Sequence, residues 1–283
     1  MSAQASEGAA PGDDAPDGAV PDDFIFSAQG ELFVPSEHAR GPWDPGALHG
    51  GAPAALMTRA FQQQEPGAEL PIARLGFELL RPVPFAPLSL STRIVRPGRR
   101  VQELAGEIHA GDQVICRASA VRVQGVPDEM PAAALAALDG EAMPPPESAE
   151  PVRFALDGSS GPSFAASAME MRWLDDPRAP GPARVWMRLR HPLLAGEPVT
   201  PLARAAATAD FGNGVSAVLP FERFLFINAD LSLHLHRQPR SEWIGLQART
   251  LLHPGGTGLA ESVLQDLDGP FGRAFQTLVV QAR

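Results

Sequence analysis

The chain contains an internal repeat at one constant spacing, and this repeat limits the folds that it can adopt. When 156 is added to a residue number, several residues fall on an identical residue. Repetition at a fixed spacing is typical of a chain built from copies of one structural unit, and 283 residues are enough for two units of ordinary size. The sequence therefore predicts two copies of one topology, related by a pseudo-twofold axis. The identities are Arg81 with Arg237, Arg93 with Arg249, and Arg117-Ala118 with Arg273-Ala274.

The predicted elements follow the same order in both halves. Each half has strand signals, then one helix with closely spaced apolar residues, then four strands. In the first half we expect a helix over residues 50–63, with strands at 24–26, 32–34, 72–81, 88–96, 101–109 and 113–123. In the second half we expect a helix over residues 201–211, with strands at 163–173, 184–190, 224–236, 243–252, 258–266 and 271–281.

These elements predict an α+β fold in which an antiparallel sheet wraps around one central helix, twice. The helix is the element available in each half to cover the apolar face of its sheet. We expect the two units at residues 24–125 and 163–283, joined by a proline- and glycine-rich linker at 126–162. Residues 1–23 contain Ala, Gly, Pro, Ser and acidic residues with no basic one, so a disordered, dispensable tail is predicted there.

Composition excludes several classes of function. All 23 basic residues are arginines, so mechanisms that need a lysine amine, such as Schiff-base or pyridoxal-phosphate chemistry, are excluded. A net charge of −10 argues against nucleic acid as a partner. The single cysteine, Cys116, cannot form an internal disulfide, and no apolar run is long enough to span a membrane. We expect a cytoplasmic protein without metal or cofactor.

Several short motifs have weak functional readings. Two glycines follow His49 at the start of the predicted helix, where backbone N–H groups can bind an anion or oxyanion. His234 and His236 share one strand face, but no third metal ligand has a recognisable spacing. Residues 212–217 match the dinucleotide fingerprint in letters but follow a helix instead of a strand. The sequence contains no Gly-x-Ser-x-Gly motif, which argues against a serine hydrolase of the α/β-hydrolase type.

Over residues 24–283 the chain resembles the double-hotdog acyl-CoA thioesterases of the thioesterase II type. The resemblance rests on motifs in a fixed order and spacing, which are weak singly and fairly specific together. They are Leu48-His49-Gly50-Gly51, Phe77-Glu78-Leu79-Leu80-Arg81-Pro82, Asp210-Phe211, Phe226-Ile227-Asn228-Ala229-Asp230-Leu231, Glu242-Trp243 and Gly272-Arg273-Ala274-Phe275-Gln276. The resemblance implies a double hotdog fold.

It also implies hydrolysis by a water held among Asp210, Asn228 and Gln276, without a covalent intermediate. Asn228 stands where the family has threonine, and an amide can still donate to and accept from water. Each residue also has a structural alternative. Asp210 would cap the helix end, Asn228 would satisfy backbone groups at a strand edge, and Gln276 would make a buried hydrogen bond.

The alternation in residues 227–236 places Asn228 with the polar residues, away from the face that should cover the helix. A β-bulge at the start of the strand, or a site between the halves, would resolve this conflict. We also expect His49, Gly50 and Gly51 to bind substrate, with backbone donation from Gly51 favoured over imidazole chemistry. Arg237, near Arg240, is expected to hold a CoA phosphate, and Arg99-Arg100 is another available pair.

The leading hypothesis is an acyl-CoA thioester hydrolase whose small-molecule substrate is acyl-CoA, with acyl chain length unspecified. A non-catalytic hotdog protein that binds an acyl ligand is the first alternative, because of Asn228. An enoyl-thioester hydratase with His49 as its base is the second. A homo-oligomer is left open.

Overall fold

The computed structural model describes residues 23–64, 70–125, 142–153 and 161–283, and the following account concerns these parts of the chain. They form a 13-stranded sheet whose named strands pair antiparallel. The first-half strands are β1 (Phe26–Gln29), β2 (Leu32–Pro35), β3 (Ile72–Leu79), β4 (Leu88–Arg96), β5 (Val101–Ala110) and β6 (Gln113–Val123). The second-half strands are β7 (Met169–Trp173), β8 (Ala183–Leu189), β9 (Phe224–Asn228), β10 (Asp230–Leu235), β11 (Ile244–His253), β12 (Thr257–Asp266) and β13 (Gly269–Ala282).

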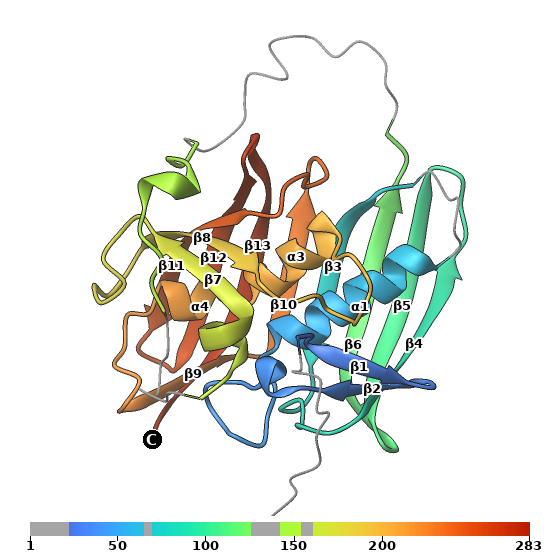
Figure 1. Ribbon diagram of the computed structural model, residues 1–283, viewed down its shortest axis with the longest axis horizontal. Coiled ribbons are helices and arrows are strands. Elements are labelled where there is room, and N and C mark those ends of the chain that lie inside the picture. Colours follow the sequence, from blue (N-terminus) through green and yellow to red (C-terminus); the bar gives the residue numbers. More distant parts are fainter. Residues whose placement is uncertain (1–22, 65–69, 126–141, 154–160) are drawn as a thin grey trace, which may run out of the picture.

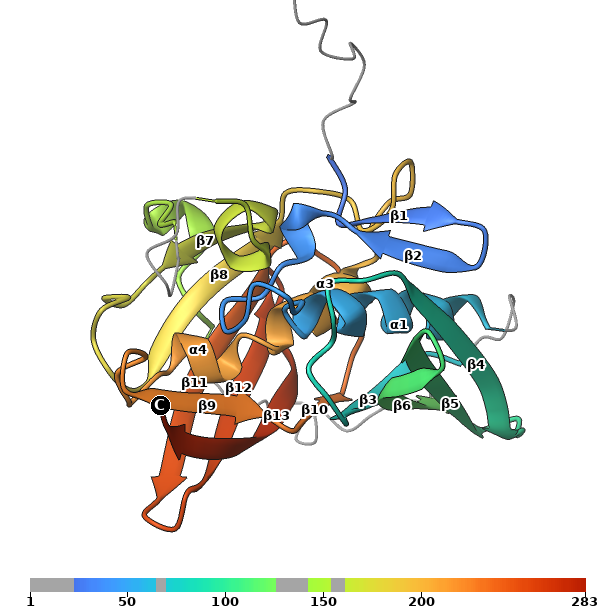
Figure 2. The same cartoon turned by 90° about the horizontal axis from the view of Figure 1, so that it is seen from below.

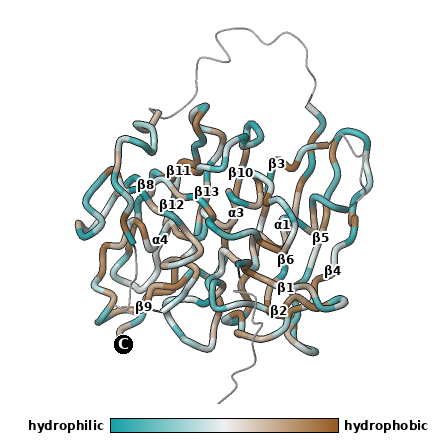
Figure 3. Tube along the Cα trace, viewed as in Figure 1, coloured by the Kyte–Doolittle hydropathy of each residue, from teal (hydrophilic) through white to brown (hydrophobic). Residues whose placement is uncertain are grey.

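One continuous sheet joins the two halves. Its order is β1-β2-β4-β5-β6-β3-β10-β13-β12-β11-β8-β7, with β9 also paired to β13, so β3 and β10 form the seam (Figure 1). Helices α1 (Gly51–Gln63) and α3 (Pro201–Ala209) contact each other at the centre. In the turned view, α1 lies between the β1–β2 hairpin and strands β3–β6 (Figure 2). Hydrophobic and hydrophilic stretches alternate along the strands of both halves (Figure 3).

The repeat spacing holds for the strands that follow the helices. Adding 156 to the bounds of β5 gives the bounds of β12, and the shifted β4 and β6 fall within β11 and β13. The helices depart from this spacing, because α1 begins at residue 51 and α3 at residue 201, which are 150 apart. The second half therefore has six more residues between the helix start and the repeated strands, and the short helix α4 (Gly212–Val215) lies in that part.

Small residues let α1 and α3 pack closely. Ala52 and Ala55 of α1 and Ala206 and Ala207 of α3 have no solvent exposure. The start of α3 is capped by the Thr200 hydroxyl, which accepts a hydrogen bond from an N–H group of the first turn at 3.1 Å. These contacts bring the C-terminal end of α3 against the N-terminal end of α1.

A buried arginine caps the other end of α1. Arg122 of β6 donates to the carbonyl oxygens of Phe61 and Gln64 at 2.6 and 2.7 Å, and to the side chain of Gln102 at 2.9 Å. The last carbonyls of a helix lack intrahelical partners and attract positive charge. Arg122 therefore fixes the position of α1 relative to the sheet.

Three of the predicted elements differ clearly from the structure, and the first is the strand expected at 24–26, which lies at Phe26–Gln29 as β1. The strand expected at 163–173 begins as a π-helix, Phe164–Ala168, before β7. The strand expected at 224–236 is interrupted at Ala229, which separates β9 from β10.

The predictions for the N-terminal tail and the linker fall mostly outside the described residues. The tail reaches the described part only at Asp23, and of the linker the structure describes residues 142–153, 161 and 162. Within this part, the Met143 N–H donates to Gln265 at 3.1 Å, and the Pro144 carbonyl accepts from Trp186 at 2.7 Å. The described part of the linker thus packs on the second half. Among the described residues, no helix has the length and apolar character needed to cross a membrane.

Candidate functional site

Two predicted site residues, Asn228 and Gln276, contact the buried carboxylate of a third, Asp210. Asp210 follows the last turn of α3 and is 6% exposed. Its Oδ1 accepts a hydrogen bond from Asn228 Nδ2 at 2.9 Å and lies 3.5 Å from Gln276 Nε2. These side chains come from three elements, α3, β9 and β13. The predicted spatial convergence is therefore present in the structure.

A β-bulge brings Asn228 to this carboxylate. Asn228 pairs with Leu278 of β13, whereas Ser232 pairs with Phe275, so four steps on one strand oppose three on the other. An extra residue reverses the side-chain alternation along a strand. The Asn228 amide also donates to the Asp230 carbonyl at 3.2 Å. The bulge resolves the conflict in alternation that the sequence presents.

Gln276 fixes the turn between α3 and α4. It is 1% exposed. Its Nε2 donates to the Asp210 backbone carbonyl at 3.0 Å, and its Oε1 accepts from the Asn213 N–H at 2.9 Å. A Cβ atom on Gly212 would lie 2.7 Å from that oxygen, so glycine permits this approach. Gln276 thus holds the backbone that carries Asp210.

His49 connects the first half of the chain to Asp210. Its Nδ1 lies 3.0 Å from Asp210 Oδ2 and 3.1 Å from the Gly51 nitrogen. The ring stacks on Phe211 with centroids 4.2 Å apart, and Phe164 lies on it at 5.0 Å. The side chains of His49 and Asp210 are 10% and 5% exposed. No local sequence pattern predicts this contact.

Two glycines allow the helices to approach at this point. A Cβ on Gly50 would lie 2.8 Å from Asp210 Oδ2. A Cβ on Gly51 would lie 2.4 Å from the backbone oxygen of Ala207. Contacts below 3.0 Å are not accessible to real Cβ atoms. The Gly50-Gly51 pair therefore has a steric role in placing α1 against Asp210.

The Asp210 carboxylate lines a largely apolar cleft of about 360 Å³. His49, Gly50 and Asn228 also line the cleft, whereas Gln276 is not part of its lining. Among the described residues of the lining, one basic side chain is present, that of Arg81. The cleft therefore combines an apolar wall, two carboxylates, those of Asp44 and Asp210, and a cation. Its apolar side chains are Pro42, Trp43, Ala47, Leu48, Leu79, Leu80, Pro82, Val83, Ile227, Ala229 and Val279.

Arg237, which the sequence analysis expects to hold a CoA phosphate, does not line this cleft. Its guanidinium makes a two-bond contact with the fully buried Asp266 at 2.6 and 2.8 Å. Its remaining N–H groups donate to the carbonyl oxygens of Pro270, Gln238 and Gly269. A guanidinium has five N–H donors, and these contacts occupy them. Arg237 is thus a structural residue.

Asp266 is held ionised by its partners. Burial by itself raises the pKa of this carboxyl, but hydrogen bonds from Arg237 and from two backbone N–H groups bring the pKa below its ordinary value. The Arg237 pKa is raised in turn, first by its hydrogen bond to Asp266. The pair links the end of β10 to the end of β12.

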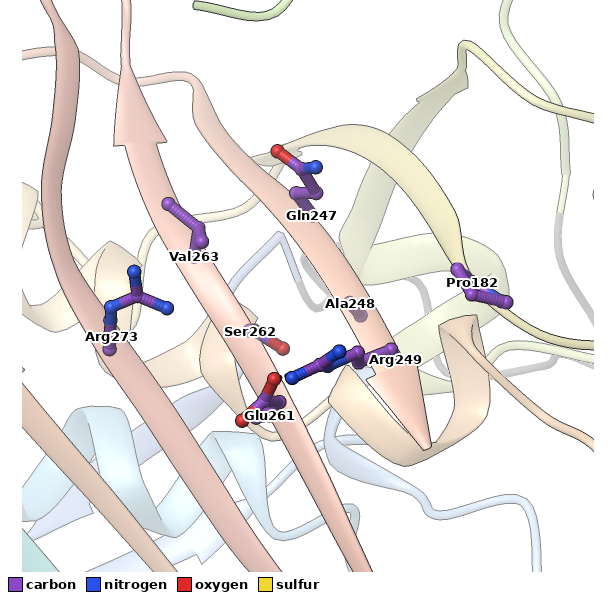
Figure 4. A pocket seen from close by; sticks show the side chains of 8 residues that line it. All are labelled: Pro182, Gln247, Ala248, Arg249, Glu261, Ser262, Val263 and Arg273. Carbon is purple, nitrogen blue, oxygen red and sulfur yellow. Dashed lines mark hydrogen bonds and ion pairs between the residues drawn. The ribbon is translucent and has the colours of Figure 1, made fainter. Parts of the chain in front are cut away.

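A second hollow, of about 260 Å³, lies over β11, β12 and β13 (Figure 4). Arg249, Glu261 and Arg273 line it, and Arg249 forms an ion pair with Glu261. None of the predicted catalytic residues belongs to its lining. Within the described part of the chain, no group of three or more His, Cys, Asp or Glu side chains is arranged to hold a metal ion. His234 and His236 therefore belong to no such group.

Sequence reasoning missed residues that shape the cleft. Trp43 lines it and packs against Phe221 and Phe226, with ring centroids 5.5 and 5.4 Å away. The available signal was an aromatic residue in a Gly- and Pro-rich loop just before His49. Asn213, whose N–H binds Gln276, was read only as part of a rejected fingerprint.

Comparison with known proteins gives consistent similarities. The acyl-CoA thioesterase N-terminal domain matches residues 39–123, and the acyl-CoA thioesterase C-terminal domain matches residues 137–280. No curated protein gave a match.

Similar solved structures share the fold at low sequence identity. A conserved hot dog fold protein of unknown function from Alicyclobacillus acidocaldarius has a TM-score of 0.67 and 18% identity, covering 93% of this chain and 98% of its own. The acyl-CoA thioesterase II TesB2 of Mycobacterium marinum has a TM-score of 0.63 and 16% identity, covering 93% and 98%. The TesB protein of Mycobacterium avium subsp. paratuberculosis has a TM-score of 0.62 and 16% identity, covering 90% and 95%. These likenesses show a hotdog fold.

Proposed function

Because this chain belongs to the acyl-CoA thioesterase family, we propose that it hydrolyses acyl-CoA thioesters to the free acid and CoA. The observation that carries the proposal is the Asp210 carboxylate, which is nearly buried, lines an apolar cleft and contacts the side chains of Asn228 and His49. A cleft of this kind suits an acyl thioester, since the acyl group is apolar and the reaction needs one positioned base.

Asp210 is the general base in the proposed mechanism. It takes a proton from a water molecule as the water oxygen bonds to the thioester carbonyl carbon. The C–S bond then breaks, and the leaving thiolate receives the proton from Asp210. A carboxylate has about four lone-pair sites, and the side chains of Asn228, Gln276 and His49 lie against three of them. The remaining site is available to the water.

Asn228 and Gln276 have different roles in this mechanism. The Asn228 Nδ2 group donates to Asp210 and to a backbone carbonyl, which leaves its side-chain oxygen to accept a hydrogen bond from the water. Gln276 holds the backbone of Asp210 and does not line the cleft. We assign Gln276 to positioning the base. The backbone N–H of Gly51, at the start of α1, is the proposed donor to the oxyanion.

We further propose that the chain is a double hotdog with units at residues 24–125 and 163–283 and one composite site. The equal spacing of the repeated strands and the continuous β3–β10 seam support this arrangement. Asp210, Asn228 and Gln276 come from the second unit, while His49 and the two glycines come from the first.

A non-catalytic acyl-CoA binder is the second candidate, and one observation favours it. Asn228 spends both N–H donors on protein acceptors, whereas a hydroxyl at this position would have a rotatable donor for the water. Hydrolysis and simple binding differ in whether free thiol is produced.

The test is the release of free thiol from a panel of acyl-CoAs of different chain lengths. We expect release by the wild type and a decrease in kcat of about 10²- to 10⁴-fold in Asp210→Asn, the usual scale for loss of a general base. Asp112→Asn, in the exposed β5–β6 turn, is the matched control and should retain full activity. Full activity in Asp210→Asn would refute the assignment. Binding without thiol release from any acyl-CoA would establish the binder, and hydration of an enoyl-CoA would establish the hydratase.

A further inference from the structure

One nitrogen of His49 lies between a donor and an acceptor. The Gly51 backbone N–H points at Nδ1 from 3.1 Å, and the Asp210 carboxylate oxygen Oδ2 lies 3.0 Å from the same atom. In a neutral imidazole, each ring nitrogen is either protonated and a donor or unprotonated and an acceptor. Nδ1 therefore cannot satisfy Gly51 and an ionised Asp210 at the same time.

The two contacts define two hydrogen-bonding states. In the first state, Nδ1 is unprotonated and accepts from Gly51, so this N–H is occupied. In the second state, Nδ1 is protonated and donates to Asp210, so the Gly51 N–H has lost its acceptor. The Gly50-Gly51 peptide lies at the edge of the cleft, because Gly50 lines it. A thioester carbonyl in the cleft can then replace the imidazole as the partner of Gly51.

We propose that His49 is a positioning residue that links the oxyanion donor to the general base. This inference rests on the proposed hydrolase function. When a substrate carbonyl binds the Gly51 N–H, His49 changes to its other neutral tautomer: Nε2 releases its proton to solvent water, and Nδ1 takes up one proton from solvent water. The new Nδ1–H then donates to Asp210 and orients that carboxylate toward the attacking water. The base is thus aligned when a carbonyl occupies the oxyanion position, and the imidazole gains no net proton.

The surroundings hold the imidazole where this exchange is possible. Phe211 stacks on the ring at 4.2 Å, and the side chains of His49 and Asp210 are 10% and 5% exposed. The missing Cβ atom of Gly50 leaves room for the Asp210 carboxylate beside the ring, because a Cβ would lie 2.8 Å from Oδ2. Water therefore has little access to compete for Nδ1.

The chain contains the same local turn without a carboxylate. His253 Nδ1 accepts from the Gly255 N–H at 3.0 Å, also two residues ahead, but this contact is exposed. No acidic partner of His253 is present among its contacts within the described residues. The turn alone thus explains the contact of His49 with Gly51, whereas the contact with Asp210 is particular to the site. His253→Phe is accordingly the matched control for substitutions of His49.

Kinetics of two variants test the proposal. His49→Phe retains a ring for stacking but has no nitrogen, so kcat should fall by about 10- to 100-fold, the scale of a hydrogen bond to a charged group, with KM and the melting temperature nearly unchanged. His49→Asn keeps an N–H donor near the position of Nδ1 and should recover most of kcat. His253→Phe should match the wild type. An unchanged kcat in His49→Phe, or a change in KM alone, would overturn the proposal.

The ring proton is also observable directly. The side-chain ¹⁵N shifts of His49 should indicate a protonated Nδ1 when an S-(2-oxoalkyl)-CoA, a non-hydrolysable ketone, is bound. An unprotonated Nδ1 in that complex would overturn the link between Gly51 and Asp210. Absence of thiol release by the wild type would instead refute the hydrolase function, and the ¹⁵N measurement would still decide the link. The two failures are therefore distinguishable.

Discussion

The two halves of the sheet have the same strand spacing and different residues at corresponding positions. Asn228 of the second half corresponds to Ile72 of the first, and Gln276 corresponds to Ala120. Ile72 and Ala120 are 3% and 1% exposed and belong to the main core cluster. The first half therefore uses for packing the positions that the second half uses to hold Asp210. At these two positions the sheet is retained in both halves, whereas the polar side chains are present in the second half alone.

The starts of the two helices differ in how their first N–H groups are satisfied. Helix α3 begins after Thr200, whose hydroxyl accepts from the Ala203 N–H, so its own side chain satisfies the helix start. Helix α1 begins at Gly50-Gly51, where no such cap is present and His49 accepts from Gly51. In the proposed mechanism the first half supplies the exchangeable backbone donor, and the second half supplies the carboxylate. The proposal of one composite site per chain rests on this division.

Arg81 and Arg237, which are 156 residues apart, also have different surroundings in the two halves. Arg237 is bound by the buried Asp266, and the residue that corresponds to Asp266 in the first half is Ala110. Arg81 therefore lacks the equivalent acidic partner and lies exposed in the cleft lining. Identical residues at corresponding positions have a structural role in one half and face the proposed substrate in the other.

The largest expected effect is on stability, in the second half. Arg237→Ala leaves the fully buried Asp266 without its cation, and removal of one partner from a buried ion pair costs about 3–5 kcal/mol. Chemical denaturation should show a decrease of that size in the free energy of unfolding. KM for acyl-CoA should stay unchanged where the variant is folded. A raised KM with wild-type stability would place Arg237 in substrate binding after all.

The loss of unfolding free energy in Arg237→Ala should depend on pH, and this dependence is a second measurement of the role of Asp266. The pKa of Asp266 is lower in the folded protein than in the unfolded chain, so its contribution to stability is complete above about pH 4, the ordinary value. That contribution is lost as the pH falls through the lower, folded pKa. The difference in unfolding free energy between wild type and Arg237→Ala should therefore narrow on acidification below about pH 4.

The next effect separates the two glycines of the first half. In Gly51→Ala the new Cβ meets a backbone oxygen of α3 at 2.4 Å, so the helices must move apart, and we expect a loss of about 1–3 kcal/mol in stability. In Gly50→Ala the Cβ meets the Asp210 carboxylate at 2.8 Å, and this side chain can rotate away. We therefore expect Gly50→Ala to lower kcat, with a smaller loss in the free energy of unfolding than in Gly51→Ala.

The control is Gly125→Ala, since a Cβ at that position meets no atom within 4 Å. Denaturation curves and initial rates of the three variants provide the comparison. Equal losses of stability in Gly50→Ala and Gly51→Ala would contradict a distinct role for each glycine.

The sequence predicted the strands well because strand periodicity and turn residues are local signals. The bounds of β4 and β6 agree with the expected 88–96 and 113–123. The 156-residue spacing failed for the helices because the added α4 segment changes chain length without changing sheet register. The interruption at Ala229 was foreseen only as one way to resolve the alternation of Asn228, since a bulge depends on pairing with β13.

The site was predictable in part, and for a different reason. The convergence of Asp210, Asn228 and Gln276 came from family resemblance, because 66 residues separate the first from the last and no local pattern links them. The contact of Arg237 with Asp266 was not predicted, because this partner, 29 residues away, is identifiable only after β10 and β12 are placed. The contact between His49 and Asp210 likewise depends on how α1 packs against α3. Local sequence patterns do not indicate contacts between residues that are distant in the sequence.

The smallest expected effect concerns Arg81, the first-half counterpart of Arg237. Its side chain is exposed, so Arg81→Ala should change the free energy of unfolding by no more than about 0.5 kcal/mol. CoA carries phosphate groups, and an exposed cation at the cleft contributes about 0.2–1 kcal/mol to binding an anion, so KM should rise up to about fivefold with kcat unchanged. Added salt screens exposed charges and should raise KM of the wild type toward that of the variant. If KM is the same in both proteins at low salt, Arg81 does not contact the CoA phosphates, and the two arginines differ only in burial.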